Sequence, residues 1–406
     1  MHDVALGRRS APASGESRWD VAVIGAGCIG ASTAKHLAEM GHSVVVLEKE
    51  AGPALHQSGR NSGVIHAGYN LAPGSEKARF CVEGSRRMRA YCRERGVAME
   101  QGGILVVAPD EERIGVVDDL MANGQANGVQ VRRLSGDEIP DVEPHAVGTA
   151  ALHAPEGASV DARGYVQALV EDAQAAGAAF RFGVRVRSLG PPVRTDRGDV
   201  DSRVVVNAAG LHADRLAAEV APDVRILPFR GAYAALRPEA NHLVRSHIYA
   251  APDPQFPFLG VHLSRRVDGT VAAGPGALLA FGREAYRPSA LRPDLLGTLT
   301  WPGFWRLLRT PAFRTQVGPE VRKSLSLRAV WKEARQLVPA LRPEHLTRGV
   351  AAGNRAQMVR RDGSLVEDIM VRETADAVHV LNAVSPGLTC SLPFGEHLAQ
   401  RAHRLL

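Results

Sequence analysis

Two histidines and one arginine are the residues whose types and positions could act on a small molecule. His66 follows a glycine-rich loop, His262 ends the apolar stretch that starts at Phe258, and Arg355 lies in a second, late glycine-rich loop. A histidine titrates near neutrality, so it can take the proton of an alcohol or an amine. An arginine can hold a carboxylate with two parallel hydrogen bonds. Each has a plainer alternative, because many histidines only complete hydrogen-bond networks and most arginines lie on the surface.

A glycine motif near the N-terminus indicates which cofactor would accompany such groups. The apolar run Val21–Ile24 leads into G-x-G-x-x-G, formed by Gly25, Gly27 and Gly30, and then into a helical pattern. These glycines allow a tight turn, close approach of a pyrophosphate, and close packing of the helix on the strand. Glu48 ends the next predicted strand, 18 residues after Gly30, near the offset at which an acid binds ribose hydroxyls. The sequence therefore predicts a dinucleotide site; the alternative is a βαβ unit that binds nothing.

Later segments would complete this first domain as a parallel sheet covered by helices. Further strands are predicted at 180–186, 203–210 and 377–382. The strand at 203–210 ends in small residues, which would let the chain pass close to a cofactor. A small-residue loop at 385–389 precedes a predicted helix whose N-terminus would face the cofactor. After a flexible leader at 1–18, the predicted domain is discontinuous and comprises residues 19–75, 150–225 and 346–406.

The rest of the chain, residues 76–149 and 226–345, has the character of a second domain. Beyond Pro228, short aromatic or β-branched stretches alternate with proline, glycine or aspartate and favour an antiparallel sheet. Residues 291–345 then read as basic, tryptophan-bearing helices. These helices either cover the sheet, the interpretation that we favour, or lie against a membrane or a partner. We expect an α/β domain of the Rossmann type joined to an antiparallel β domain.

Composition and charge exclude several classes of protein. The 406 residues, 45% of them hydrophobic and 23% charged, suit a globular chain of two domains. The net charge of +6 comes from arginines interleaved with acids, which argues against nucleic acid but suits an anionic substrate or membrane face. The absence of a long apolar run predicts a cytoplasmic protein. The four cysteines are widely spaced and no ligand cluster is apparent, so neither a disulfide framework nor a metal is expected.

Seven longer motifs carry a resemblance to known enzymes. They are HQSGRNSGVIHAG at 56–68, APGSEKA at 72–78, PFRGAY at 228–233, IYAAPDPQFPFLGVH at 248–262, GNRAQ at 353–357, RDGSLVED at 361–368 and NAVSPGLTCSL at 382–392. Together they resemble the L-2-hydroxyglutarate oxidase family, which belongs to the D-amino-acid-oxidase-like flavoproteins. The resemblance runs from residue 20 nearly to the C-terminus. It implies a Rossmann-type FAD-binding domain, a second substrate domain, and FAD as the cofactor.

The resemblance also implies a set of site residues. Those that would lie along FAD are Gly25, Gly27, Gly30, Glu48, Lys49, Arg60, Asn61, Ser62, Val186, Ala209, Gly210, Gly387, Leu388 and Thr389. The motif glycines would receive the pyrophosphate, Glu48 the adenosine ribose and Val186 the adenine. The amides of residues 387–389 would face the isoalloxazine carbonyl, where negative charge gathers on reduction. His66, His262 and Arg355 would flank the substrate on the open face of the flavin.

The chain departs from the family pattern in several loops. The family usually reads GHNSG where Arg60 stands, GIYYKPGS at 68–75, GVRAQ where Asn354 stands and NAPSP where Val384 stands. We expect these loops near the substrate, so FAD and the reaction type are more firmly implied than 2-hydroxyglutarate itself. A related or larger biosynthetic hydroxy acid is the alternative.

The sequence thus predicts FAD-dependent oxidation of an L-2-hydroxy acid to the 2-oxo acid. A histidine would take the hydroxyl proton, Arg355 would hold a carboxylate, and the hydride would go to flavin N5. Electrons would leave to oxygen or a quinone, and peripheral membrane contact is compatible with the basic helices. Two other functions stay open: an amine or amino-acid oxidase on the same scaffold, and a flavin-binding partner protein without turnover.

Overall fold

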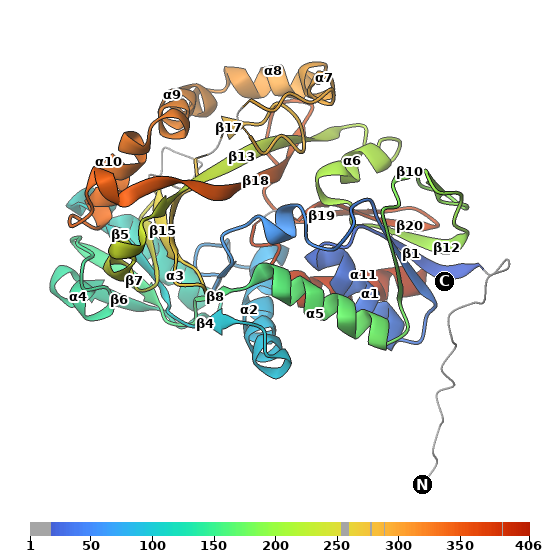
Figure 1. Cartoon of the computed structure of the whole chain (residues 1–406), viewed down its shortest axis with the longest axis horizontal. Helices are drawn as coiled ribbons and strands as arrows, with labels where there is room; N and C mark the ends of the chain where they lie inside the picture. Colours follow the sequence, from blue (N-terminus) through green and yellow to red (C-terminus); the bar gives the residue numbers. More distant parts are fainter. Residues whose placement is uncertain (1–17, 253–259, 277, 288, 384) are drawn as a thin grey trace, which may run out of the picture.

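The computed structural model describes residues 18–406 apart from 253–259, 277, 288 and 384. Most of the predicted leader, the centre of the motif at 248–262 and Val384 therefore lie outside the described residues. Two large sheets organise the described chain, one mostly parallel and one mostly antiparallel (Figure 1). This agrees with the fold class that the sequence predicts.

The six-stranded sheet has the order β19-β20-β12-β1-β2-β9, and only its edge pair β19–β20 is antiparallel. Its strands are β1 (Trp19–Ile24), β2 (Val44–Glu48), β9 (Ala179–Phe182), β12 (Ser202–Asn207), β19 (Met370–Glu373) and β20 (Ala377–Asn382). The inner strands β1, β2, β12 and β20 are mostly apolar because both of their faces are buried, whereas the edge strands β9 and β19 are partly exposed. Val21 and Val23 face α1 (Cys28–Glu39) and α11 (Ser391–Arg404), while Ala22 and Ile24 face residues 184–200. Those residues include the hairpin of β10 (Val186–Ser188) and β11 (Arg194–Thr195).

The larger sheet has the order β17-β13-β16-β15-β14-β5-β7-β6, and β18 pairs with β13. Its strands are β5 (Ile104–Ala108), β6 (Arg132–Ser135), β7 (Ala150–Ala154), β13 (Val224–Leu236), β14 (His247–Ala250), β15 (His262–Arg265), β16 (Val271–Gly274), β17 (Leu278–Leu279) and β18 (Leu346–Arg360). The strands beyond Pro228 pair antiparallel with one another, as expected, and the one parallel pair joins β14 to β5. A third, small sheet has the order β3-β8-β4, and its strands β3 (Val64–Ile65), β8 (Ala158–Val160) and β4 (Met99–Glu100) pair antiparallel.

Strand β18 corrects the prediction of a late glycine-rich loop. Residues 346–360 pair with almost the whole of β13, and Arg355 lies opposite Phe229. Gly353 is needed for a close approach rather than for a turn, because a Cβ there would lie 2.0 Å from the carbonyl oxygen of Arg60. The glycines therefore let a strand pass beside the loop at residue 60. The proposed domain boundaries stay a prediction, although residues 346–360 hydrogen-bond to the larger sheet and not to the smaller one.

Helices cover both sheets. The remaining ones are α2 (Glu76–Arg95), α3 (Ile114–Ala126), α4 (Ile139–Val142), α5 (Ala162–Ala175), α6 (Ala213–Leu216), α7 (Leu295–Leu299), α8 (Pro302–Arg309), α9 (Pro311–Leu325) and α10 (Leu327–Leu337). The Ser75 hydroxyl caps the N-terminus of α2 by accepting from the Ala78 amide at 3.1 Å. Helices α7 to α10 run along the outside of β13 and β18 (Figure 1). Trp301 and Phe304 of this segment are buried against β13 and β18, as packing on the sheet requires.

Two features of the described chain bear on its surroundings. Among the helices of the described residues, none is both long and apolar enough to cross a bilayer. The cysteines at 28, 81, 92 and 390 are all buried and form no disulfide.

Candidate functional site

A cavity of about 680 Å³ lies where the ends of β1 and β12 face β13 and β18. This volume is within the range of pockets that bind cofactors or other small molecules. Every site residue predicted from the sequence lines the cavity except Gly30. The structure thus brings together residues spread from Gly25 to Thr389, while the individual roles assigned to them stay predictions.

The first turn of α1 forms one end of the wall. Gly25 has a φ of +104° and passes so close to Ala208 that a Cβ would lie 2.8 Å from that residue's carbonyl oxygen. A Cβ on Gly27 would lie 2.9 Å from the Ser58 hydroxyl, so side chains here would fill the space beside the helix N-terminus. Gly30 lies behind the wall, where a Cβ would be 2.0 Å from the Gly25 carbonyl oxygen. The motif therefore leaves the N-terminus of α1 open to the cavity, as the predicted phosphate site requires, and its third glycine allows close packing.

Glu48 and the loop at 56–63 form the next part of the wall. The Glu48 carboxylate accepts hydrogen bonds from the amides of Ala26 at 2.8 Å and Glu50 at 2.9 Å, which fixes it at the end of β2. Asn61 donates to the Ser58 carbonyl at 2.7 Å and accepts from the Gly63 amide at 2.8 Å. These bonds organise the loop internally, so its polar groups are held in place along the cavity.

The loop at 385–390 closes the opposite side. Thr389 accepts a hydrogen bond from the amide of His66 at 3.1 Å, which joins this loop to the end of β3. A Cβ on Gly84 of α2 would lie 2.1 Å from the carbonyl oxygen of Thr389, so the loop also rests closely on α2. The segment at 387–389 is thereby fixed beside the candidate base His66.

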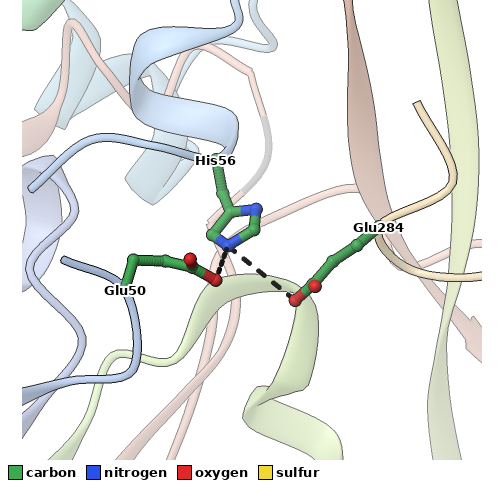
Figure 2. Close-up of side chains that lie close together, drawn as sticks. All are labelled: Glu50, His56 and Glu284. Carbon is green, nitrogen blue, oxygen red and sulfur yellow. Dashed lines mark hydrogen bonds and ion pairs between the residues drawn. The ribbon is translucent and has the colours of Figure 1, made fainter. Parts of the chain in front are cut away.

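A charged cluster lies at the edge of the cavity (Figure 2). Glu50, His56 and Glu284 bring their side-chain ligand atoms within 4.8 Å of one another, as metal ligands could. However, the Lys49 ammonium contacts all three: it bonds Glu50, and it lies 2.8 Å from His56 Nε2 and 2.7 Å from Glu284 Oε1. An ammonium of the protein therefore already pairs with both carboxylates, and we do not assign a metal to them.

Glu284 links this cluster to His212. Its carboxylate lies 2.7 Å from His212 Nε2, and the hydrogen bond from His212 is the main reason that the pKa of Glu284 is lowered. Burial outweighs the Glu284 carboxylate in setting the pKa of His212, which is also lowered. Glu284 comes from the segment 281–287 of the chain's second half, whereas Lys49 and His212 follow strands of the six-stranded sheet. The ion pairs therefore fasten 281–287 across one edge of the cavity.

Two departures from the family pattern contact the same segment, 281–287. The guanidinium carbon of Arg60 lies 4.2 Å from the ring centroid of Tyr286. Asn354 donates a hydrogen bond to the carbonyl of Arg283 at 2.8 Å. Both residues line the cavity, as expected, but Tyr69 does not: it is buried in the core formed with β5 and α3. The expectation that residues 69–72 face the substrate therefore fails at Tyr69.

The candidate catalytic residues gather at the other end of the cavity. His262 stacks on Tyr249 with ring centroids 4.3 Å apart, and Tyr233 approaches the same imidazole edge-on at 6.4 Å. Burial lowers the pKa of His66 to about 4 and that of His262 to about 3. Both imidazoles are thus neutral at pH 7 and able to accept a proton. Protonating either would place a charge among buried rings.

Arg355 is the cationic group at this end. Protein surrounds its side chain, yet the cavity leaves the guanidinium accessible, and burial lowers its pKa. Among the described residues it forms no ion pair with a carboxylate. Such a guanidinium is suited to a carboxylate brought in by a ligand.

Sequence reasoning missed several residues of the site. Tyr233 and Tyr249 line the cavity, and His247 lies behind His262 on the same sheet. Period-2 alternation in β14 could have shown that His247 and Tyr249 share one face while Ile248 faces the core. No local signal marks His212 or Glu284, because their pairing depends on contact between segments 72 residues apart.

Comparisons with known proteins agree on one group of enzymes. The model of the DAO family, described as FAD dependent oxidoreductase, matches residues 20–401. The L-2-hydroxyglutarate dehydrogenase of Indibacter alkaliphilus is 37% identical over 93% of this chain and 97% of its own length. That of Escherichia coli K12 is 36% identical over 96% and 94%, and the human mitochondrial enzyme is 35% identical over 98% and 91%.

Solved structures show the same fold at lower identity. An L-α-glycerophosphate oxidase from Mycoplasma pneumoniae, with FAD bound, superposes with a TM-score of 0.75 at 23% identity, covering 96% of this chain and 95% of that one. A glycine oxidase from Geobacillus kaustophilus gives a TM-score of 0.72 at 21% identity, covering 95% of each chain. At these identities the likeness concerns the fold alone.

Proposed function

The chain belongs to the FAD-dependent oxidoreductases of the DAO family, within the L-2-hydroxyglutarate dehydrogenase family, and from this premise we propose that it oxidises L-2-hydroxyglutarate or a close relative to the 2-oxo acid. The free Arg355 guanidinium beside two neutral buried histidines is the observation that supports this substrate class most directly. A carboxylate next to a carbinol is the chemical pattern that these groups match.

The residues of the cavity fit FAD. Gly25 and Gly27 leave room for a pyrophosphate at the N-terminus of α1, Glu48 is held at the end of β2 for the ribose, and Ala209 and Gly210 follow β12. Bound FAD supplies a hydride acceptor at flavin N5. The fixed amides of residues 387–389 would stabilise negative charge near the flavin carbonyl.

The chain's own residues would perform the proton and binding steps. A neutral histidine, His262 or His66, takes the hydroxyl proton of the substrate as the hydride leaves the carbinol carbon. Arg355 holds the carboxylate and thereby orients that carbon. Tyr249 and Tyr233 enclose the His262 ring, which limits water at the reacting centre. The step yields the 2-oxo acid and a protonated histidine, and the hydride would pass to bound FAD.

The electron acceptor we propose is a quinone or oxygen, reached at an anionic membrane surface of the cytoplasmic side. Large apolar side chains are exposed at Phe281, Leu291, Leu296, Leu299, Trp305, Val317 and Val321. Exposed arginines accompany them at 287, 292, 306, 309, 314 and 322, whereas the acids of this stretch, Glu284, Asp294 and Glu320, are not exposed. An apolar, basic face of this kind suits the surface of an anionic bilayer.

Vesicle sedimentation tests the membrane proposal. The protein should sediment with vesicles of phosphatidylglycerol and phosphatidylcholine but not with phosphatidylcholine alone, and Leu296→Glu should weaken that binding. Met40→Glu, an exposed apolar residue at the C-terminal end of α1 and far in the fold from α7 to α9, is the matched control. Equal sedimentation with both vesicle types would refute the charge-based contact.

Product analysis tests the proposed reaction. Purified yellow protein given L-2-hydroxyglutarate and an artificial electron acceptor should form one 2-oxoglutarate for each two electrons transferred. D-2-hydroxyglutarate is the control for stereochemistry. Protein that carries no flavin, or flavoprotein that forms no 2-oxo acid from any L-2-hydroxy acid, would contradict the proposal.

A further inference from the structure

Three buried polar atoms without a partner among the described residues lie on one face of the β14–β15 pair. They are Nδ1 of His247, Oγ of Ser264 and Nδ1 of His262. His247 lies directly opposite Ser264 in the antiparallel register, and residues two apart on a strand share a face. His262 and Ser264 are two apart on β15, so the three side chains follow one another along the sheet. All three residues are at least nine-tenths buried.

The other nitrogen of His247 reveals its tautomer. Its Nε2 lies 3.2 Å from the Ser159 hydroxyl, and that hydroxyl donates to the carbonyl of Arg265 at 2.5 Å. Because the single hydroxyl proton of Ser159 is used in that bond, His247 must be the donor to Ser159 through Nε2–H. In a neutral imidazole the second nitrogen then carries no proton. Nδ1 of His247 is therefore a buried acceptor that faces the Ser264 side of the sheet without a donor.

Nδ1 of His262, in contrast, would be a buried donor that needs an acceptor. Its Nδ1 is buried, while the residue lines the cavity, so Nε2 is the nitrogen that a substrate can reach. To accept a substrate proton at Nε2, the neutral ring must carry its own proton on Nδ1. That buried N–H requires an acceptor. No two of these three atoms lie within hydrogen-bond distance of each other, so Ser264 can accept from His262 and donate to Nδ1 of His247 only through bridging water.

We propose that Ser264 and His247 are positioning residues of the oxidation, which hold His262 in the tautomer that presents an unprotonated Nε2 to the substrate. The chain of hydrogen bonds runs from His262 Nδ1–H past Ser264 Oγ–H to His247 Nδ1 by way of buried water, and Ser159 anchors its far end. The inference rests on the proposed function and makes His262, rather than His66, the base. No proton leaves along the chain: His262 gains the substrate proton at Nε2 and keeps its own at Nδ1.

Other titratable groups around His247 do not replace this role. Tyr249 lies on the same face and stacks on His262. Burial raises the pKa of Tyr249, and the nearby Ser264 hydroxyl, which can also donate to Tyr249, partly offsets that rise. His66 follows β3, which pairs with the strand of Ser159. Glu100 and Arg265 form an ion pair at 3.7 Å whose carboxylate side chain is about half exposed, away from the buried row. Among the described residues, no carboxylate bonds the ring of His262; the backbone carbonyl of Gly260 lies beside that ring and raises its pKa against the larger effect of burial.

Paired variants separate the two nitrogens of His247. His247→Gln keeps an N–H donor within reach of Ser159 but places no acceptor at Nδ1, whereas His247→Asn keeps a polar group near Nδ1 and loses the bond to Ser159. Ser264→Ala breaks the chain at its centre without adding volume. His153→Gln, a half-buried histidine of β7 outside the cavity wall, is the control.

Rapid mixing with L-2-hydroxyglutarate over a range of pH provides the kinetic test. We expect His247→Gln and Ser264→Ala to slow flavin reduction roughly 10- to 100-fold, as when the orienting partner of a functional histidine is removed. Substrate Kd should stay unchanged, and the acid limb of the pH profile should shift. His247→Asn should retain more of the rate than His247→Gln. Wild-type rates and pH profiles in both His247→Gln and Ser264→Ala would overturn the proposal.

Nitrogen NMR of ¹⁵N-histidine-labelled protein tests the tautomer without turnover. His262 should be protonated at Nδ1 in the wild-type protein and should show mixed tautomers in Ser264→Ala. A His262 protonated at Nε2 in the wild-type protein would overturn the inference. If wild-type flavin is not reduced by L-2-hydroxyglutarate, the proposed function fails, while the NMR result still decides the tautomer. Ser264→Ala keeps the test available should His247→Gln fail to fold.

Discussion

Asn354 donates a hydrogen bond to the backbone carbonyl of Arg283 at 2.8 Å and so ties β18 to the segment that crosses the edge of the cofactor cavity. The guanidinium of Arg283 forms a buried ion pair with Asp214 of α6, with Nη2 to Oδ2 at 2.8 Å. The segment 281–287 is thus fastened from two sides. Its conformation depends on strands and helices that are distant in the sequence.

Breaking the Arg283–Asp214 pair should destabilise the protein strongly. Asp214→Asn leaves the buried guanidinium without a counter-charge, which costs about 3 to 5 kcal/mol. The midpoint of urea unfolding measures this loss. Asp201→Asn removes an exposed partner of Arg18 and should change the midpoint little. An unchanged midpoint for Asp214→Asn would show that the pair contributes nothing.

Glu284 should couple FAD retention to pH. Its pKa is lowered in the folded protein, so its stabilising contribution is present above the ordinary glutamate pKa of about 4.3 and is lost as the pH falls below that value. Glu284→Gln should release FAD faster at pH 7, because Lys49 and His212 lose their partner. Flavin fluorescence on dilution measures the release. Glu39→Gln, which removes the exposed partner of Lys35, should behave as wild type.

Gly30→Ala should abolish cofactor binding although Gly30 does not line the cavity. The added Cβ would meet the Gly25 carbonyl oxygen at 2.0 Å and push α1 away from β1. Gly115→Ala in α3, where a Cβ meets nothing within 4 Å, is the control and should keep its flavin. The flavin-to-protein absorbance ratio decides between them. A yellow Gly30→Ala protein of normal stability would be inconsistent with the packing described for the motif.

Arg355 should set substrate affinity. Arg355→Lys keeps the charge but loses the two parallel hydrogen bonds to the carboxylate, and we expect the Kd to rise about tenfold. Arg355→Met should raise the Kd about 100-fold, since a charged hydrogen bond contributes roughly 1.5 to 3 kcal/mol. Titration of the oxidised enzyme with the 2-oxo acid product, followed by the flavin spectrum, gives Kd without turnover. Equal affinity in Arg355→Met would remove Arg355 from the binding site.

The pH profile should show that the base is a buried neutral histidine. Burial lowers the pKa of His66 to about 4 and of His262 to about 3, so either ring is neutral throughout the neutral range. The rate of flavin reduction should therefore stay level from pH 8 to about 5 and fall only at lower pH. A rate that falls with an apparent pKa near 6.5 would indicate an exposed histidine instead.

Much of the architecture could be predicted from local sequence. The glycine motif, the capped helix α2 and the strand at 203–210 each depend on residues close together, and all are present. The structure also gathers all but one of the predicted site residues around one cavity. Those residues were predicted from motifs that the chain shares with a family of enzymes binding the same cofactor.

The wrong and missed predictions share a physical cause, because each depends on contacts between residues far apart in the sequence. Residues 349–357 read as a loop because glycines usually mark turns, yet here they allow β18 to pass the backbone of Arg60. Glu284 and His212 carry no local pattern because each acquires its role from the other. Nothing in the local sequence distinguishes His247 from other residues of a short strand. Only the register of β14 with β15 places it behind His262. Tyr69 was expected at the substrate and lies in the core.

Anaerobic mixing of the flavoprotein with a panel of substrates tests the central claim most directly. L-2-hydroxyglutarate should bleach the flavin within the mixing experiment, larger L-2-hydroxy acids should be compared beside it, and glycine, D-amino acids and L-amino acids should leave the spectrum unchanged. Bleaching by an amine or amino acid but by none of the hydroxy acids would contradict the account.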